Sequence, residues 1–307
     1  MTHSVFIDGA AGTTGLEIVE RLAPRAEFKL VVLDDEQRKS AEARRDAFHS
    51  ADFAVLCLPD EAAREAVAMA EGAAVRIIDA SSAFRVDPAW TYGFPELVGR
   101  EQVAAASRVT NPGCYPTGFL AGVAPLVRHG LLPGDWPYTC HAVSGYSGGG
   151  KALIARFGGD PDIAFRDYGL ALGHKHVAEM QEYAGLAHPP LFAPAVIPAH
   201  RGMIVEVPLH LAQMRRAAPV DGLRDFLTDF YGSSAVVHVN ADAPDELLLR
   251  AAMQPSDRLD LWVLGSRDGS QARLVARLDN LGKGASGAAV QSLNLMAGLD
   301  ETAGLAL

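Results

Sequence analysis

A strand, a glycine-rich turn and a helix follow one another at the start of the chain, and this order constrains the fold more than any other feature. Residues 5–7 form a short apolar run, residues 9–15 contain three glycines, and residues 16–22 carry apolar side chains at helical spacing. Further strands, separated by helical segments, are expected over residues 28–33, 53–58 and 75–78. Strands that alternate with helices predict an α/β fold, with a parallel, doubly wound sheet that holds its ligand at the carboxyl ends of the strands.

The glycine turn indicates the kind of ligand. A turn of this type, placed before a helix, brings a pyrophosphate onto backbone N–H groups at the helix N-terminus. We therefore expect cofactor contacts from Gly9, Gly12, Thr13, Thr14 and Gly15. The spacing is G-x-x-G-x-x-G and departs from the usual G-x-G-x-x-G, so a turn that only packs a helix on the sheet is the alternative.

The end of the second expected strand bears on the choice of dinucleotide. An acidic residue there usually accepts the ribose hydroxyls of NAD, whereas a basic side chain accommodates the 2′-phosphate of NADP. The chain has both, because Asp34 and Asp35 are followed closely by Arg38 and Lys39. Asp34 and Arg38 are candidate cofactor contacts, a solvated helix face is the alternative for the two cations, and the choice between NAD and NADP stays open.

Cys114 stands where a strand ends and a helix begins, within the segment Asn-Pro-Gly-Cys-Tyr-Pro-Thr at residues 111–117. The apolar periodicity over residues 118–129 predicts the helix, so the thiol lies at the positive end of its dipole. Such a field lowers the pKa of a cysteine and favours the thiolate, the form that attacks acyl carbons. The alternative is a small buried residue in a turn.

Composition excludes several classes of protein. A chain of 307 residues with 49% hydrophobic content can bury a large core and divide into two domains. It has no apolar run of membrane-spanning length and no N-terminal leader, so we expect a cytoplasmic protein. The three cysteines lack metal-ligand spacing and indicate neither a disulfide framework nor a metal site. A net charge of -10 argues against nucleic-acid binding.

The second half of the chain has a different pattern. Alternating stretches at residues 203–209, 261–266 and 273–278 predict antiparallel strands that are exposed on one face. We expect residues 1–113 to form a Rossmann-type dinucleotide-binding domain and residues 114–284 to form a sheet-rich catalytic domain of α+β type. A helix over residues 285–299 returns to the first domain, which residues 285–307 complete.

Two loops of the second half could bind anions. Residues 144–151 contain Ser144, several glycines and Lys151, which suits either a phosphate cradle or a sharp turn. Farther along the chain, His200 and Arg201 precede a strand, and the guanidinium could bind a carboxylate or a phosphate in bidentate fashion. A turn or surface role is the alternative for each.

Several motifs lie in order along the chain: the glycine turn at 9–15, Asp-Ala-Ser-Ser-Ala-Phe-Arg at 79–85, Tyr-Gly-Phe-Pro-Glu-Leu at 92–97, the cysteine segment at 111–117, the serine-glycine loop at 144–151 and Arg-Gly at 201–202. Together they resemble the N-acetyl-gamma-glutamyl-phosphate reductase family, essentially end to end, and the short first domain resembles its compact subgroup. One departure lies at 79–85, where the commoner form has Leu before the first Ser and Ala-Asp after it.

The resemblance implies NADP(H), a Rossmann domain and an α+β catalytic domain similar to those of aspartate-semialdehyde and glyceraldehyde-phosphate dehydrogenases. It also implies a homo-oligomer, either a dimer or a tetramer, and a small acyl-phosphate substrate. The expected reaction is the reduction of N-acetyl-γ-glutamyl phosphate to N-acetylglutamate semialdehyde in arginine biosynthesis. Because hydride reduces a carboxylate poorly, Cys114 is expected to form a thioester that NADPH reduces after phosphate has left.

The resemblance also implies the role of a histidine, whereas the binding roles are expected from charge and from position in the chain. His174 or His176, with His200 as a weaker candidate, is expected to act as general acid and base, and the sequence leaves the choice open. Arg85 and Arg201 are expected to bind the phosphate and the α-carboxylate, and Ser144, Lys151 and His200 are further substrate contacts. Cofactor contacts are also expected from Ser81, Ser82 and Asn280.

Two other functions are consistent with these residues. A related reductase would share the chemistry of Cys114 and act on aspartyl phosphate or on a carrier-bound aminoadipyl phosphate. A dinucleotide sensor without turnover would keep the fold and bind cofactor only, and the intact cysteine and histidines argue against this.

Overall fold

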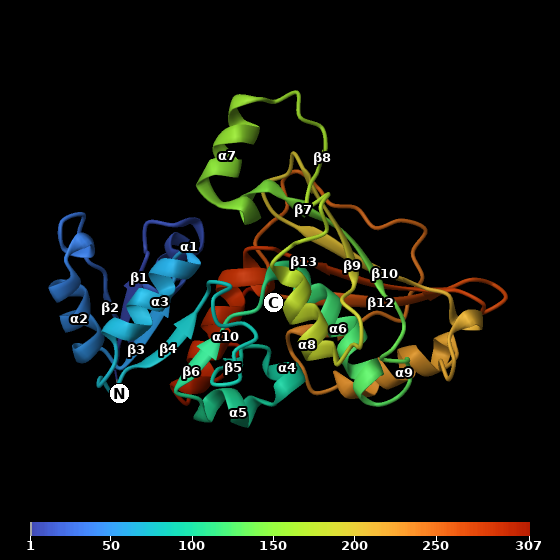
Figure 1. Ribbon diagram of the computed structural model, residues 1–307, viewed down its shortest axis with the longest axis horizontal. Helices are drawn as coiled ribbons and strands as arrows, with labels where there is room; N and C mark the ends of the chain where they lie inside the picture. The colour runs from blue at the N-terminus through green and yellow to red at the C-terminus, as the bar shows by residue number, and fades with distance from the viewer. Residues whose placement is uncertain (1) are drawn as a thin grey trace. The chain divides into compact units, whose positions relative to one another are not determined.

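The computed structural model describes residues 2–307, which divide into two compact units. The first unit contains the chain up to Pro112 together with Ala285–Leu305, and the second contains Gly113–Gly284 with Ala306–Leu307. Each unit is built on its own β-sheet (Figure 1).

The first unit is a parallel six-stranded sheet with the order β2-β1-β3-β4-β6-β5. Its elements are β1 (His3–Asp8), α1 (Thr13–Leu22), β2 (Phe28–Val31), α2 (Ala41–Ser50), β3 (Phe53–Leu56), α3 (Asp60–Met69), β4 (Arg76–Asp79), β5 (Thr91–Tyr92), α4 (Pro95–Val98), α5 (Arg100–Ala105), β6 (Arg108–Thr110) and α10 (Gly287–Met296). This arrangement confirms the predicted doubly wound parallel sheet.

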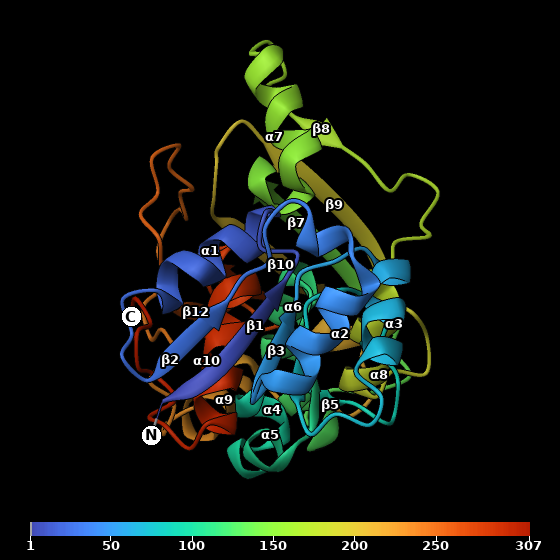
Figure 2. The same ribbon diagram turned by 90° about the vertical axis from the view of Figure 1, so that its left-hand side faces the viewer.

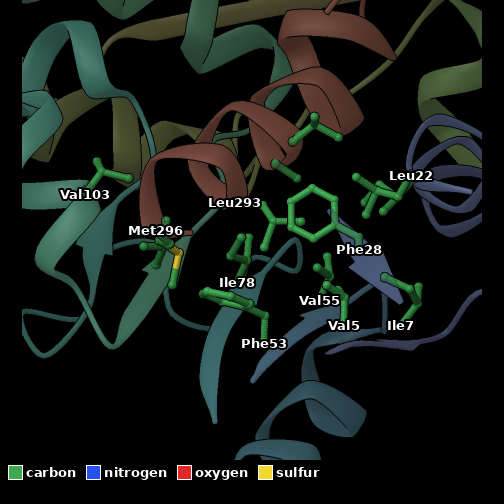
Figure 3. Packing of buried hydrophobic residues seen from close by; sticks show 14 residues of the cluster. Val5, Ile7, Leu22, Phe28, Phe53, Val55, Ile78, Val103, Leu293 and Met296 are labelled. Carbon is green, nitrogen blue, oxygen red and sulfur yellow. The ribbon is translucent and has the colours of Figure 1, made fainter. Parts of the chain in front are cut away.

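Helices cover both faces of this sheet. Successive side chains of each strand point to opposite faces, so apolar residues of one strand pack with helices on both sides. Val5 and Ile7 of β1 pack with α1, α5 and α10, whereas Phe6 between them packs with α2 and α3. Figure 3 shows the first of these clusters, where Phe28 meets Leu293 of α10. Helix α10, which follows the second unit in sequence, therefore supplies part of the core of the first.

The order of the strands creates a ligand-binding position next to β1. Strand β2 follows β1 in the chain and lies on one side of it, whereas β3 lies on the other side (Figure 2). The connections that leave β1 and β3 therefore run in opposite directions along the sheet. In open α/β sheets, ligands bind outside the carboxyl ends of the strands at such a point. The glycine turn begins there, directly after Asp8.

The second unit is a seven-stranded mixed sheet with the order β11-β12-β13-β10-β7-β9-β8. Four of its six strand pairs are antiparallel, as predicted for this half of the chain. Its elements are α6 (Cys114–Arg128), β7 (Thr139–Gly145), α7 (Gly150–Gly159), β8 (Arg166–Asp167), α8 (His176–Ala184), β9 (Leu191–Ile197), β10 (Met203–Leu209), α9 (Val220–Phe230), β11 (Val237–Val239), β12 (Leu259–Gly265) and β13 (Ala272–Leu278).

Helix α6 packs closely on this sheet through two glycines one turn apart. A Cβ atom on Gly118 would lie 2.7 Å from Cγ2 of Val205, and one on Gly122 would lie 3.4 Å from Cβ of Leu274. The helix begins at Cys114, four residues before the predicted start at 118. Pro116 does not delay it, because the N–H groups of a first helical turn have no acceptor within the helix.

The opposite face of the sheet carries charged pairs. Glu206 lies beside Val205 on β10 and therefore points away from α6, and its Oε1 lies 2.6 Å from Nη2 of Arg273 on β13. Within residues 2–307, no helix combines the length and the apolar character that crossing a membrane requires.

Candidate active site

Cys114 is the first residue of α6. Gly113 is the N-cap in an extended conformation, and its carbonyl accepts hydrogen bonds from both N–H and Oγ1 of Thr117, each at 2.9 Å. The cysteine is partly buried. A thiol in this position lies at the positive end of a fifteen-residue helix dipole, which favours its ionised form.

The surroundings of Cys57, which is also partly buried, and of the buried Cys140 disfavour the thiolate. Burial raises the pKa of Cys57 to about 12, and the carboxylates of Asp79 and Asp8 add to the rise. Burial also raises the pKa of Cys140. Both thiols therefore stay protonated at neutral pH, and neither is activated as a nucleophile. Among residues 2–307, no three His, Cys, Asp or Glu side chains are grouped so that they could hold a metal ion.

A buried carboxylate that sequence reasoning missed holds the cysteine loop. The N–H of Gly113 donates to Oε2 of Glu179 at 3.1 Å, and Glu179 on α8 is only 1% exposed. In the sequence, only one feature of Glu179 points to the site: it follows His176 by three residues, which places both side chains on the same face of the helix. Glu179 thus ties the residue before Cys114 to the helix that carries His176.

The two candidate histidines lie together. His176 begins α8, and His174 precedes it in the loop, with 4.6 Å between the two ring centroids. The backbone N–H of His176 donates to Nδ1 of His174 at 3.2 Å, so this nitrogen accepts a hydrogen bond. Both rings pack against Tyr115, the residue after Cys114, at 6.5 and 5.9 Å between centroids.

Two tyrosines complete this part of the site. The Tyr115 hydroxyl donates to the carbonyl of Ala195 at 3.0 Å, and burial raises its pKa far above the usual value. The ring of Tyr168 packs against His174 at 5.7 Å between centroids. Burial raises the pKa of Tyr168 to about 12, and the nearby charge of Cys114 contributes to the rise. Tyr168 was not predicted, because a single tyrosine in a polar loop carries no sequence signal.

The serine-glycine loop is packed against the loop that follows β9. A Cβ atom on Gly145 would lie 2.7 Å from the carbonyl oxygen of Ala199, so only glycine fits there. Ser144 is buried at the end of β7, whereas Lys151 is exposed in the first turn of α7, which projects from the sheet (Figures 1 and 2). His200 is exposed, and its ring contacts Tyr146 edge-on at 5.6 Å.

Arg201 and Asn280 are anchored within the same unit. Nη1 of Arg201 lies 2.9 Å from Oδ2 of Asp279, whose side chain is fully buried. Asn280 accepts the N–H of Gly202 on Oδ1 and donates from Nδ2 to Oγ of Ser147, both at 2.9 Å. The structure therefore places Asn280 between two loops of the second unit, and its contact with a nicotinamide amide stays a prediction.

The glycine turn after β1 fits a pyrophosphate. Gly9 has a φ of +87°, and a Cβ atom on it would lie 2.4 Å from the carbonyl oxygen of Cys57. A Cβ atom on Gly15 would lie 2.4 Å from the carbonyl oxygen of Gly9. Helix α1 begins at Thr13, and its N-cap Gly12 makes no side-chain cap hydrogen bond, so the first N–H groups of the helix have no partner from the capping residue.

The residues after β2 form an exposed acidic and basic turn. Oδ1 of Asp34 accepts the N–H groups of Glu36 and Gln37 at 2.9 and 2.8 Å. Nε of Arg38 lies 2.9 Å from Oδ1 of Asp35, and both side chains are largely exposed. Because an exposed ion pair contributes little to stability, Arg38 can exchange Asp35 for another anion without disturbing the fold.

Ser81 and Ser82 lie at the carboxyl end of β4 and bind carboxylates of their own unit. Oγ of Ser81 donates to Oδ2 of Asp79 at 2.6 Å, and Oγ of Ser82 donates to Oδ2 of Asp60 at 2.7 Å. Burial raises the pKa of Asp79, while the hydrogen bonds from Ser81 partly oppose this rise. The two serines thus end the strand on the side of the sheet where the glycine turn lies.

Arg85 is buried in the first unit. Its Nε donates to the carbonyl of Asn111 at 3.1 Å and Nη2 to that of Ala80 at 3.4 Å. Arg201 belongs to the second unit, so the two cations expected to bind substrate come from different units.

Two family models match the chain. A model described as the NAD binding domain of semialdehyde dehydrogenase matches residues 4–106, and one described as the semialdehyde dehydrogenase dimerisation domain matches residues 114–280. The first match shows that the chain carries a domain for a nicotinamide dinucleotide.

Solved structures with the same fold include aspartate-semialdehyde dehydrogenases. That of Vibrio cholerae in complex with ASA has a TM-score of 0.72 at 17% identity, with 96% of this chain and 98% of that chain covered. A probable aspartate-semialdehyde dehydrogenase from Pseudomonas aeruginosa has a TM-score of 0.71 at 20% identity, with the same coverage. These neighbours confirm the predicted two-domain fold.

Curated relatives are similar over nearly the whole length. The chain is 47% identical to N-acetyl-gamma-glutamyl-phosphate reductase 2 of Nostoc sp., with 98% of each chain covered. It is 48% identical to the N-acetyl-gamma-glutamyl-phosphate reductase of Burkholderia ambifaria, with 96% of each chain covered. At this identity and coverage, the chain belongs to the N-acetyl-gamma-glutamyl-phosphate reductase family.

Proposed function

We propose that the protein reduces N-acetyl-γ-glutamyl phosphate to N-acetylglutamate 5-semialdehyde and phosphate, a step of arginine biosynthesis. The observation that carries this proposal is the position of Cys114 at the start of α6, with His174 and His176 packed on the adjacent Tyr115. Relatives named for this reaction are 47% and 48% identical to the chain over nearly its full length, which supports the choice of substrate.

The first half of the reaction needs a nucleophile and a base. The sulfur of Cys114 attacks the acyl carbon, a carbon–sulfur bond forms, and the carbon–oxygen bond to phosphate breaks. One of the two histidines takes the thiol proton, which contributes about a hundredfold to ten-thousandfold to the rate in typical cases. The product is a thioester on Cys114, which is more easily reduced than a carboxylate.

The second half returns the cysteine to its starting state. The nicotinamide cofactor supplies the hydride that reduces the acyl carbon. The protonated histidine then gives its proton to the oxyanion, and the resulting thiohemiacetal breaks its carbon–sulfur bond to release the semialdehyde and the thiol. His174 and His176 both stay candidates for this histidine, with His200 as the weaker one.

Binding roles follow from charge and position. We assign NADP(H) to the glycine turn at Gly9, Gly12, Thr13, Thr14 and Gly15, together with Asp34, Arg38, Ser81, Ser82 and Asn280. Arg38 supports NADP over NAD, because its exposed guanidinium can turn to a 2′-phosphate. Arg201 is assigned to the α-carboxylate and Arg85 to the phosphate, with Ser144, Lys151 and His200 as further substrate contacts.

We also propose which part of the chain binds the cofactor and which part carries the catalytic residues. Residues 1–113, completed by 285–307, bind the dinucleotide, and residues 114–284 carry the catalytic cysteine and the subunit contact. The sheet of the second unit supports an oligomer, because α6 covers one face whereas Ile204 and Val143 on the other face are only half-buried. The match to a dimerisation domain over residues 114–280 agrees with a dimer or a dimer-based tetramer.

A substrate panel tests the function. In the reverse direction, NADP-dependent and phosphate-dependent oxidation of N-acetylglutamate semialdehyde is expected to exceed that of aspartate semialdehyde by at least about a hundredfold in kcat/KM, a ratio that specific polar recognition supplies. Preference for aspartate semialdehyde or a carrier-bound aminoadipate semialdehyde would assign a related reductase. Cofactor binding without any turnover would indicate a sensor.

A further inference from the structure

Asp279 is a buried charged residue for which the reaction has no direct use. It follows β13, and its side chain is fully buried. Oδ1 accepts the N–H of Leu281 at 3.0 Å, and Oδ2 accepts the N–H of Ser256 at 3.3 Å. A carboxylate held by two backbone N–H groups is fixed in place, and Arg201 provides the opposite charge that its burial requires.

The backbone around Arg201 is fixed as well. The N–H of Gly202 donates to Oδ1 of Asn280 at 2.9 Å, and Asn280 directly follows Asp279 in the chain. Gly202 has a φ of +98°, and a Cβ atom on it would lie 2.5 Å from the sulfur of Met253. The dipeptide Asp279-Asn280 therefore holds the side chain of Arg201 and the peptide group after it.

We propose that Asp279 is a positioning residue, which holds the guanidinium of Arg201 at a fixed point where it recognises the α-carboxylate of the substrate. This inference rests on the proposed function. An arginine that is held before binding loses less rotamer entropy when the ligand arrives. A carboxylate is the better match than the phosphate dianion, because Asp279 already balances one positive charge while the planar guanidinium keeps its bidentate geometry.

The first test compares two aldehydes in the phosphate-dependent reverse reaction. One is N-acetylglutamate semialdehyde, and the other is 4-acetamidobutanal, the same aldehyde without the α-carboxylate. In Asp279→Asn, the KM for the first is expected to rise by about tenfold or more, the loss that follows when a charged partner is misplaced. The KM values for 4-acetamidobutanal and for phosphate are expected to stay within about twofold of wild type.

A second test shows whether Asp279 acts through Arg201. The variant Arg201→Lys keeps the charge and loses the planar fork, so it should lose the same preference for the carboxylated aldehyde. The double variant should then be no worse than Arg201→Lys alone, because coupled residues are not additive. Asp221→Asn removes an exposed ion pair to Arg224 at a similar distance and is the control that should leave all constants unchanged.

Binding without turnover gives an independent measurement. N-acetylnorvaline has the α-carboxylate and the chain length of the semialdehyde but no aldehyde, and N-acetylnorvalinamide lacks the charge. By calorimetry, Asp279→Asn should weaken the first about tenfold and leave the second unchanged. If Asp279→Asn does not yield folded protein, Asp279→Glu, which keeps the charge and displaces the carboxylate by one methylene, carries the same comparison.

Three outcomes would overturn the inference: an unchanged preference for the carboxylate, a rise confined to the KM for phosphate, or equal losses for both aldehydes and both analogues. The last would mean a structural role only. A wild-type protein that oxidises neither aldehyde, yet binds N-acetylnorvaline in an Asp279-dependent way, would contradict the proposed function and leave the positioning role standing.

Discussion

At the scale of single residues, the three cysteines show how local surroundings decide reactivity. The sulfur at the start of α6 meets the field of a helix, whereas the other two are held as thiols by burial. The amino acid is the same in each case, so the difference comes from solvation and dipoles alone.

The variant Cys114→Ser tests the covalent route. A hydroxyl is a far weaker nucleophile at neutral pH, so kcat is expected to fall by at least about a thousandfold while NADPH binding, measured by fluorescence titration, is retained. Cys140→Ala removes a buried sulfur from β7 and should keep kcat. Turnover of Cys114→Ser at the rate of wild type would rule out the thioester.

The variant Arg38→Ala tests the choice of dinucleotide. Loss of the guanidinium should raise the KM for NADPH about tenfold and leave that for NADH within about twofold, since only the former carries a 2′-phosphate. Steady-state kinetics with both cofactors measure the ratio. Lys39→Ala, at the neighbouring exposed cation, is the matched control, and equal effects of both variants would assign a diffuse electrostatic role.

At the scale of secondary structure elements, α6 and α8 act as a pair. Helix α6 presents the cysteine, and α8 presents His176 and, three residues on, the carboxylate that accepts the Gly113 N–H. This hydrogen bond links the N-cap of α6, next to Cys114, to the helix that begins at His176.

Glu179→Ala is expected to leave the Gly113 N–H without this acceptor. Such a loss costs about 1–3 kcal/mol of unfolding free energy, measured by urea denaturation. Glu179→Gln keeps an oxygen acceptor and should retain most of that stability. A destabilisation of the same size in both variants would show that the charge, and not the hydrogen bond, is what matters.

The glycines of α6 offer a second pair of variants. Gly118→Ala places a Cβ atom 2.7 Å from Val205 and should destabilise by about 1–3 kcal/mol through overpacking. Gly122→Ala meets Leu274 only at 3.4 Å, so the gain in helix propensity of up to about 1 kcal/mol should dominate. Thermal unfolding measures the stability of both variants. A Gly118→Ala protein that is more stable than Gly122→Ala would contradict the close approach of α6 to the sheet at Gly118.

Local pattern predicted the elements well, and tertiary contacts explain what it missed. The alternation at 203–209 coincides with β10 because each strand residue is buried or exposed by its own face. The helix α6 starts four residues before the apolar periodicity that predicts it, because its first turn contains Tyr115, Pro116 and Thr117 and does not follow that pattern. Glu179 and Tyr168 could not be predicted, since their importance depends on residues distant in sequence that only the fold brings near.

At the scale of the whole molecule, each unit builds its own core around its own sheet. The first unit buries both faces of a parallel sheet, and the second buries one face of a mixed sheet with α6 against it. This difference suits the proposed roles, because a sheet with one face open can pair with a second copy, whereas a sheet covered on both faces cannot.

Alkaline pH is expected to destabilise the folded chain. Burial raises the pKa of Cys57 from 9.0 to about 12 and that of Tyr168 from 10.0 to about 12. Between pH 9 and 12 the unfolded chain therefore loses protons that the folded chain keeps, so the unfolding free energy falls as pH rises, by at most about 1.4 kcal/mol per pH unit for each group. Urea denaturation at several pH values measures this slope, and a flat profile would contradict the burial of these groups.

The contrast among the three sulfurs has a practical consequence. If a mild alkylating reagent modifies only the thiol at the head of α6, each competent molecule takes up one label. Counting labels by intact mass would then give the fraction of functional chains in a preparation, before any substrate has been synthesised.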